Sequence, residues 1–242
     1  MAEPAESGID WDETVDVLCV GTGPGVLSYG LFCAANDLDV LIVESDELDP
    51  QTAQWRASMT EDLGDVVPTA HLSLIGAEPD PIGRINDRTK LEPFVGEELR
   101  LWSADCAASA FGVMLTEVPD LERMRTADGQ FITAGVVGPF RVDGPTPGAA
   151  LSRWLREQAD DLLGPASDRL AGLVTDEGRI AGVELHTEDG PRRIAATRGV
   201  AIGVGPVPDA WPEQPEFDGV TVDVAVVSRT AGRLARVELL RR

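Results

Sequence analysis

The chain has 242 residues, of which 43% are hydrophobic, so it is long and apolar enough for one large domain or two small ones. Its net charge of −22 argues against nucleic acid and anionic membrane surfaces as partners, because both would repel it. No apolar run approaches the roughly 18 residues of a membrane span, and the start does not read as a secretory signal, so we expect a cytoplasmic protein.

The first elements of the chain follow an acidic start. Residues 1–13 carry five acids and no base, and we expect a solvated tail before a single domain over 14–242. An apolar run over 14–20 leads into a glycine-rich turn, a helical stretch over 25–37 and a second apolar run over 39–44. This order predicts a β–α–β dinucleotide-binding unit.

Each part of that unit has a physical role. Gly21 permits a tight turn out of the first strand, and Gly23 has no Cβ, so the backbone can approach a diphosphate. The helix that follows presents free N–H groups and a positive dipole end. Glu44 stands where an acid can accept hydrogen bonds from a ribose. The third glycine of the G-x-G-x-x-G pattern is replaced by Val26, which predicts either a displaced helix or a small residue opposite it.

The middle of the chain is less regular. Residues 46–92 read as an irregular excursion broken by prolines, with at most a short helix around Ala53–Asp62. A helix is expected over 94–110, and strands over 112–118 and 130–137.

The last third alternates clearly between elements. A helix is expected over 147–163, with Leu151, Leu155, Ala159 and Leu162 facing inward. Four strands and a hairpin follow in the pattern, at 170–175, 180–186, 192–197, 200–204, and 222–226 with 235–239. The sequence therefore predicts an α/β fold with a central parallel sheet of the FAD/NAD(P)-binding (Rossmann-like) type, a β-meander and a C-terminal β-hairpin.

The motifs Trp11–Gly25, Leu38–Ser45 and Pro147–Gly205 resemble the FAD-binding domain of the fumarate reductase/3-ketosteroid dehydrogenase flavoproteins. The resemblance implies an FAD cofactor. Its implied binding residues are Gly21, Gly23, Pro24 and Gly25 at the diphosphate, Glu44 and Ser45 at the ribose, and Gly203 and Gly205 on the far side.

The chain departs from that family at several points. Asp46–Met59 contains no glycine, the length is about half the usual one, and no substrate-capping domain is recognisable. Catalytic residues cannot be assigned, because the single tyrosine, Tyr29, falls on the first helix. His71 and His186 are too few for a convincing metal site, and Cys19, Cys33 and Cys106 lack a C-x-x-C spacing, as expected for buried thiols in a reducing compartment.

Two functions remain open. The chain is either an FAD-binding oxidoreductase, or the FAD-binding subunit of one, or else a non-catalytic, cofactor-free relative that acts as a structural or regulatory partner. An NAD-dependent enzyme is a weaker third reading. The missing cap, the acidic surface and an exposed hairpin edge point to a partner subunit or a homo-oligomer, and the resemblance implies a steroid or lipid-like substrate.

Overall fold

The computed structural model describes most of the chain. Described are residues 9–44, 50–63, 67–80, 96–163, 169–204, 208–229 and 232–241. The predictions for residues 1–8, Ser45 and Gly205 concern residues outside these ranges.

The described elements are four α-helices, two short 3-10 helices and thirteen strands. The helical elements are α1 (Pro24–Ala34), α2 (Pro50–Thr60), η1 (Glu61–Leu63), α3 (Glu97–Ala108), α4 (Pro147–Leu163) and η2 (Pro215–Phe217). The strands are β1 (Glu13–Val15), β2 (Val17–Val20), β3 (Val40–Val43), β4 (Leu74–Pro79), β5 (Gly112–Leu115), β6 (Glu122–Thr126), β7 (Phe131–Arg141), β8 (Arg169–Asp176), β9 (Arg179–Thr187), β10 (Gly190–Ala196), β11 (Val200–Gly203), β12 (Thr221–Ser228) and β13 (Leu234–Arg241).

The expected β–α–β unit is present. β2 and β3 pair in parallel, α1 connects them, and β11 pairs in parallel with the other edge of β2. All four residues of β2 are buried, as an apolar strand covered on both faces requires. β5 then pairs antiparallel with β11 and ends the run of parallel strands.

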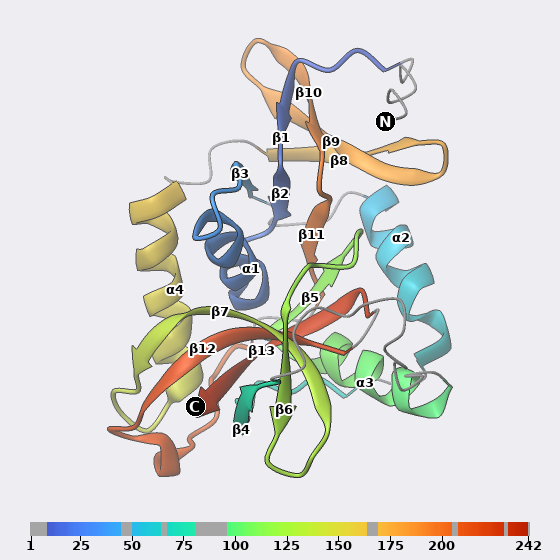
Figure 1. Cartoon of the computed structure of the whole chain (residues 1–242). Coiled ribbons are helices and arrows are strands. Elements are labelled where there is room, and N and C mark those ends of the chain that lie inside the picture. The colour runs from blue at the N-terminus through green and yellow to red at the C-terminus, as the bar shows by residue number, and fades with distance from the viewer. Residues whose placement is uncertain are drawn as a thin grey trace.

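The rest of this sheet differs from the expected one. Strands β12, β7, β6, β4 and β13 follow one another in pairing order, and β12 also pairs with β13, so the five strands close into a ring (Figure 1). Four of the five ring pairings are antiparallel, and only β4 with β13 is parallel. The prediction of one central parallel sheet is therefore wrong for most of the strands, and the fold is mixed α/β.

The C-terminal hairpin is confirmed, but its edge is not exposed. β12 pairs with β7 on its other side, and β13 pairs with both β5 and β4 on its other side. A ring removes unpaired edges, because each strand finds two neighbours.

The expected meander is also confirmed. β8, β9 and β10 pair in sequence, and β1 joins them in parallel beside β10, above the larger sheet in Figure 1. One of its faces shares a buried cluster with the parallel strands, in which Leu18, Val183 and Ile194 are completely enclosed.

The expected helices appear close to their predicted bounds. α4 begins and ends as predicted, with Leu151, Leu155 and Ala159 buried, but Leu162 is 63% exposed, so that inward assignment is wrong. Strands β4 and β6 were not expected. No helix in the described ranges is long and apolar enough to cross a membrane.

Candidate functional site

Three strands end at the same level, and this brings the predicted glycines and acid together. Val20 pairs with both Val43 and Ile202, so the next residues along β2, β3 and β11 are Gly21, Glu44 and Gly203. The Gly21 N–H donates to the Val43 carbonyl oxygen at 2.8 Å, which fixes the start of the turn. The carboxyl edge of such a sheet is the usual place for a ligand.

The turn between β2 and α1 leaves its front face open. Gly21 has φ of +102°, a conformation that residues with a Cβ rarely adopt, and Gly23 is the N-cap of α1. A Cβ added at either glycine would meet no atom within 4 Å. A ligand atom can therefore approach this backbone closely.

The start of α1 is electrostatically suited to an anion. Pro24 occupies the first turn, where its fixed φ suits a helix start, and the first turn contains no acidic residue. In a chain of net charge −22, no carboxylate of that turn competes for the positive end of the helix dipole.

The structure explains how Val26 is accommodated. Val26 is completely buried, and its Cγ2 atom lies 3.4 Å from the point where a Cβ on Gly203 would stand. The small residue required opposite Val26 is thus Gly203. Close approach of the helix occurs one position earlier, where a Cβ on Gly25 would lie 2.6 Å from the carbonyl oxygens of Phe111 and Gly112. Gly25 therefore has a packing role.

Glu44 ends β3 with its side chain exposed. Its backbone forms a bridge to Arg169 at the start of β8, and its carbonyl oxygen accepts the Leu170 N–H at 3.3 Å. The meander thereby holds the end of β3 in place while the carboxylate faces solvent.

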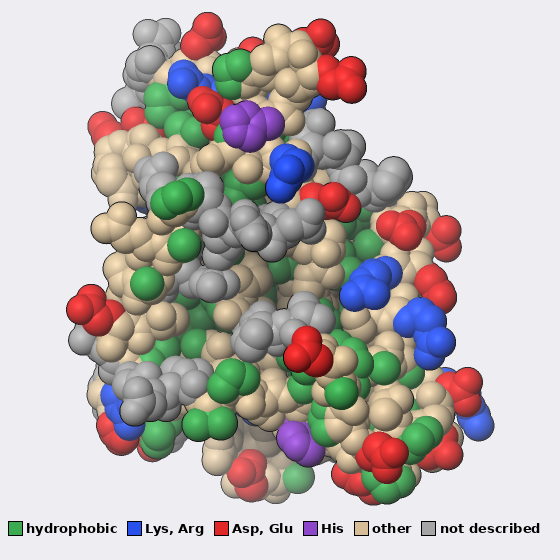
Figure 2. All heavy atoms as spheres, turned by 180° about the vertical axis from the view of Figure 1, so that it is seen from behind, with side chains coloured by type: hydrophobic (Ala, Val, Ile, Leu, Met, Phe, Trp, Pro, Cys, Tyr) green, Lys and Arg blue, Asp and Glu red, His purple; other side chains and the backbone are tan. Residues whose placement is uncertain are grey.

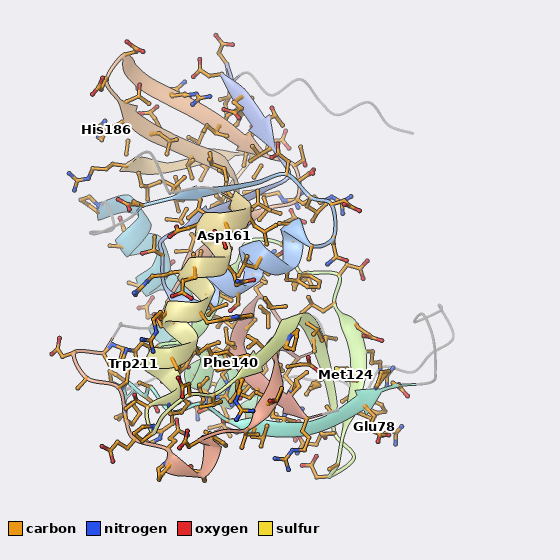
Figure 3. All side chains as sticks on the ribbon, turned by 90° about the vertical axis from the view of Figure 1, so that its left-hand side faces the viewer. Glu78, Met124, Phe140, Asp161, His186 and Trp211 are labelled. Carbon is orange, nitrogen blue, oxygen red and sulfur yellow. The ribbon has the colours of Figure 1, made fainter. Side chains whose placement is uncertain are left out.

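A pocket of about 310 Å³ lies next to the segment that precedes β5. Its lining residues come from two chain segments: Pro68, Thr69, Ala70, His71, Pro208, Ala210 and Pro212. Thr69 is joined to the segment just before β5, since its N–H donates to Ala108 and its carbonyl oxygen accepts from Ala110. Trp211, inside the second segment, lies beside the start of α4 (Figure 3), and a Cβ on Gly148 of α4 would lie 2.4 Å from its ring.

The two segments of that pocket are locked together. The Gln214 side chain is buried, its oxygen accepts the Leu72 N–H at 3.0 Å, and its nitrogen donates to the Leu72 carbonyl oxygen at 2.9 Å. Trp211 also packs against Phe111, with ring centroids 5.3 Å apart. The sequence indicates His71 as a candidate residue but not which residues surround it. Nothing local in the sequence predicts that residues 68–71 and 208–212 meet.

Tyr29 and the three cysteines are buried and do not face a ligand at the surface. Tyr29 is buried in α1, where burial raises the pKa of its hydroxyl. Burial also raises the pKa of the Cys19 and Cys106 thiols, and that of Cys33 to about 11, so these are packing residues as expected. No group of three metal-ligating side chains occurs within the described ranges.

Acidic side chains are scattered over the face seen from behind in Figure 2, rather than gathered in one patch.

No protein-family model matches the chain, and no curated protein does. Among solved structures it is similar to a 3-ketosteroid-Δ4-(5α)-dehydrogenase from Rhodococcus jostii RHA1, at 18% identity and a TM-score of 0.34 over 81% of this chain and 47% of the other. The chain is also similar to the open conformation of a flavocytochrome c3 fumarate reductase, at 16% identity and a TM-score of 0.31 over 77% of this chain and 33% of the other. A third similar structure is a geranylgeranyl bacteriochlorophyll reductase-like protein from Thermoplasma acidophilum, at 13% identity and a TM-score of 0.28 over 76% of this chain and 38% of the other.

The chain spans less than half the length of each of these structures. The first two carry the enzyme names of the family that the sequence resembles, and the likenesses are too loose to assign a fold or a function. Membership of that family stays a prediction.

Proposed function

We propose that the chain binds FAD at the carboxyl edge of β2, β3 and β11, as the nucleotide-binding part of a flavoprotein oxidoreductase. The observation that carries this proposal is the open glycine turn at the acid-free start of α1, level with Glu44. The packing of Val26 against Gly203 supports it further. Val26 replaces the third glycine of the motif, and Gly203 provides the space that its side chain needs.

The residues of this edge fit the parts of a dinucleotide. The backbone N–H groups of Gly23, Gly25 and Val26 would face the diphosphate; Pro24 has no N–H to offer. The Glu44 carboxylate would accept hydrogen bonds from the adenosine ribose. Gly203 would lie on the far side of the nucleotide, although the space at its missing side chain is occupied by Val26. The roles of Ser45 and Gly205 remain predictions from the resemblance.

The order of strands gives the ligand a direction. From Glu44 the strand order passes β2 and β11 to β5, and the segment just before β5 contacts Thr69, which lines the His71 pocket. With the ribose at Glu44, the other end of the dinucleotide would extend toward β5. When bound, the flavin supplies the hydride chemistry, while the protein positions it.

The substrate site requires more than this chain. The described residues of the carboxyl edge offer Glu44 but no residue with a clear catalytic role, and no capping domain is recognisable. We propose that a partner subunit or a second copy completes a site for a steroid or lipid-like substrate.

The test is titration of the purified protein with FAD, followed by visible absorbance and by analysis of the released cofactor. Gly23→Val should remain folded, because the space at its Cβ is empty, and should lose binding. Glu44→Ala should weaken binding by about 1–3 kcal/mol. Glu188→Ala removes an exposed acid from the β9–β10 turn and is the matched control. Undiminished binding by Gly23→Val contradicts the proposed pose.

The alternative is a cofactor-free structural or regulatory partner. It is favoured by the burial of Tyr29 and by the lack of an evident catalytic group at the edge. A folded wild-type protein that takes up no FAD would support it. Val26→Gly should not restore binding in that case, because Val26 is already matched by Gly203.

A further inference from the structure

A second pocket, of about 350 Å³, opens on the ring of strands, away from the carboxyl edge. Its lining comes from β4, β6, the end of β13 and one residue beyond β6: Gly76, Ala77, Glu78, Pro79, Arg125, Thr126, Ala127 and Arg241. Glu78 lies on the opposite side of the molecule from Trp211 (Figure 3). None of its lining residues belongs to β2, β3, β11 or α1, so this pocket is separate from the proposed nucleotide site.

The strand register places two arginines on one face above a glycine. Arg125 of β6 stands directly opposite Glu78 of β4, and Arg241 of β13 stands opposite Gly76 of β4. Residues 76 and 78 share a face, because side chains alternate along a strand. With strands about 4.8 Å apart and about 3.4 Å per residue, the two arginine Cα atoms are roughly 12 Å apart. The two arginines therefore flank β4 on the face that Gly76 and Glu78 share.

Gly76 forms the floor of this space. A Cβ at this position would have only the Cβ of Ala127 within 4 Å, at 3.8 Å, so the glycine is not needed for packing. Its backbone is fixed, since its carbonyl oxygen accepts the Ala127 N–H at 3.0 Å. The missing side chain leaves the space above Gly76 open, between the strands that carry Arg125 and Arg241.

Neither arginine is neutralised by an acidic side chain in the described ranges. Seven arginines of these ranges form ion pairs with carboxylates: Arg100, Arg123, Arg179, Arg192, Arg193, Arg198 and Arg236. Arg125 and Arg241 belong to the described arginines that form no such pair, although Glu78 stands beside Arg125. What distinguishes them is that both line the same pocket.

Arg125 is also held in place. Its guanidinium carbon lies 4.6 Å from the centroid of the Phe131 ring, and that of Arg123 lies 3.8 Å from the same ring. Arg123 is neutralised by Asp80 at 3.1 Å, so it does not draw Glu78 away. A guanidinium stacked on a ring keeps its N–H edge free for bidentate contact with an oxyanion.

We propose that this pocket binds a small oxyanion, a carboxylate or phosphate group, with Arg125 as the bidentate partner and Arg241 as the second cation. Glu78 opposes binding, since its carboxylate carries the same charge as the ligand. The site does not depend on FAD binding.

The test is calorimetric titration of the full chain with inorganic phosphate and, separately, with succinate, at constant ionic strength. We expect saturable binding of at least one of them below about 10 mM, and the stronger binder identifies the source of the oxyanion. Arg125→Gln and Arg241→Gln should each weaken it about ten-fold or more. Gly76→Val should weaken it without a change of charge, because it fills the floor of the pocket.

Two controls and one opposite effect make the proposal falsifiable. Arg179→Gln removes the same charge from an arginine paired with Glu117 and should leave binding unchanged. Gly23→Val should also leave it unchanged, which separates this pocket from the start of α1. Glu78→Gln should tighten binding several-fold. The proposal is overturned if neither anion binds, if Arg179→Gln weakens binding as much as Arg125→Gln, or if Glu78→Gln fails to tighten it.

Discussion

The β2–α1–β3 unit and the ring of five strands both bury apolar side chains, but they are built differently. The first is almost continuous in sequence, from Val17 to Val43, with β11 added later. The ring joins distant segments, since Leu74 of β4 pairs with Leu239 of β13. The unit ends in open glycines and an exposed acid, whereas the ring closes on itself.

The two regions meet at α1. A Cβ on Gly135 of β7 would lie 2.9 Å from the Phe32 ring of α1, so the helix rests directly on the ring. Val26 of α1 and Val224 and Leu239 of the ring belong to one buried cluster. The difference teaches that the local unit supplies the proposed binding surface, while the ring supports the helix that presents it.

The largest effect is expected from damage to the ring. Leu240 is completely buried in β13, and Leu240→Ala should lower the free energy of unfolding by about 2–5 kcal/mol, through lost burial and the cavity left behind. Leu162→Ala makes the same chemical change at a position that is 63% exposed, and should cost less than about 0.5 kcal/mol. Urea unfolding measures both. Equal costs would mean that β13 is not enclosed as the ring requires.

The next effect separates packing from binding within one turn. Gly25→Ala places a Cβ 2.6 Å from two backbone carbonyl oxygens, so α1 must shift, at a cost of about 1–3 kcal/mol or more. Gly23→Ala meets no atom within 4 Å and should leave unfolding nearly unchanged. The comparison fails if urea denaturation shows Gly23→Ala to be the more damaging of the two.

The local unit could be predicted from sequence because each of its signals is local. Apolar runs, the glycines at 21 and 23 and the acid at 44 follow one another closely, and the helix and the second strand were found where predicted. The strand predicted over 14–20 is divided, because residues up to Val15 form β1 beside the meander and only Val17–Val20 form β2. Val26 could be recognised as needing a small residue opposite, but Gly203 is 177 residues away and only the paired strands identify it.

The ring could not be predicted in the same way. β4 holds a glycine and ends in a proline, inside a stretch that reads as irregular, and β6 is largely charged. Their pairing depends on partners elsewhere, since β4 is held between β6 and β13. The apolar residues at every second position of 222–226 and 235–239 predicted a hairpin correctly. The same pattern occurs in a hairpin with an exposed edge and in one that closes a ring, so it could not distinguish the two.

A double-mutant cycle sharpens the role of Gly203. Gly203→Val adds methyl groups toward Val26, whose Cγ2 is already 3.4 Å from the Cβ position, and should cost about 1–3 kcal/mol. In a Val26→Ala background the clash is relieved, so the two changes should couple by about 1 kcal/mol in chemical unfolding. Strict additivity would show that α1 and β11 do not meet at this pair.

The smallest effect concerns the acids of the two regions. Glu44 is exposed at the carboxyl edge, whereas Glu238 of β13 is 1% exposed and its carboxylate contacts Arg236. Burial raises the pKa of Glu238, although Arg236 and Ser73 act in the opposite direction. The folded state therefore holds this proton more tightly than the unfolded state does. The stability that the protonated group contributes is present below the ordinary glutamate pKa and is lost as the pH rises through the raised one.

Glu238→Gln should remove that dependence, because the amide keeps the shape of the side chain and carries no charge to bury. The free energy of unfolding of the wild type minus that of the variant should fall with increasing pH above about 4.3, by at most about 1.4 kcal/mol per pH unit. Chemical unfolding at a series of pH values measures the difference, and Glu188→Gln, at an exposed turn, is the control and should give a flat one. A difference that rises with pH at Glu238 would mean that its ion pair with Arg236 outweighs burial, and that the ring tolerates a buried charge better than its closure implies.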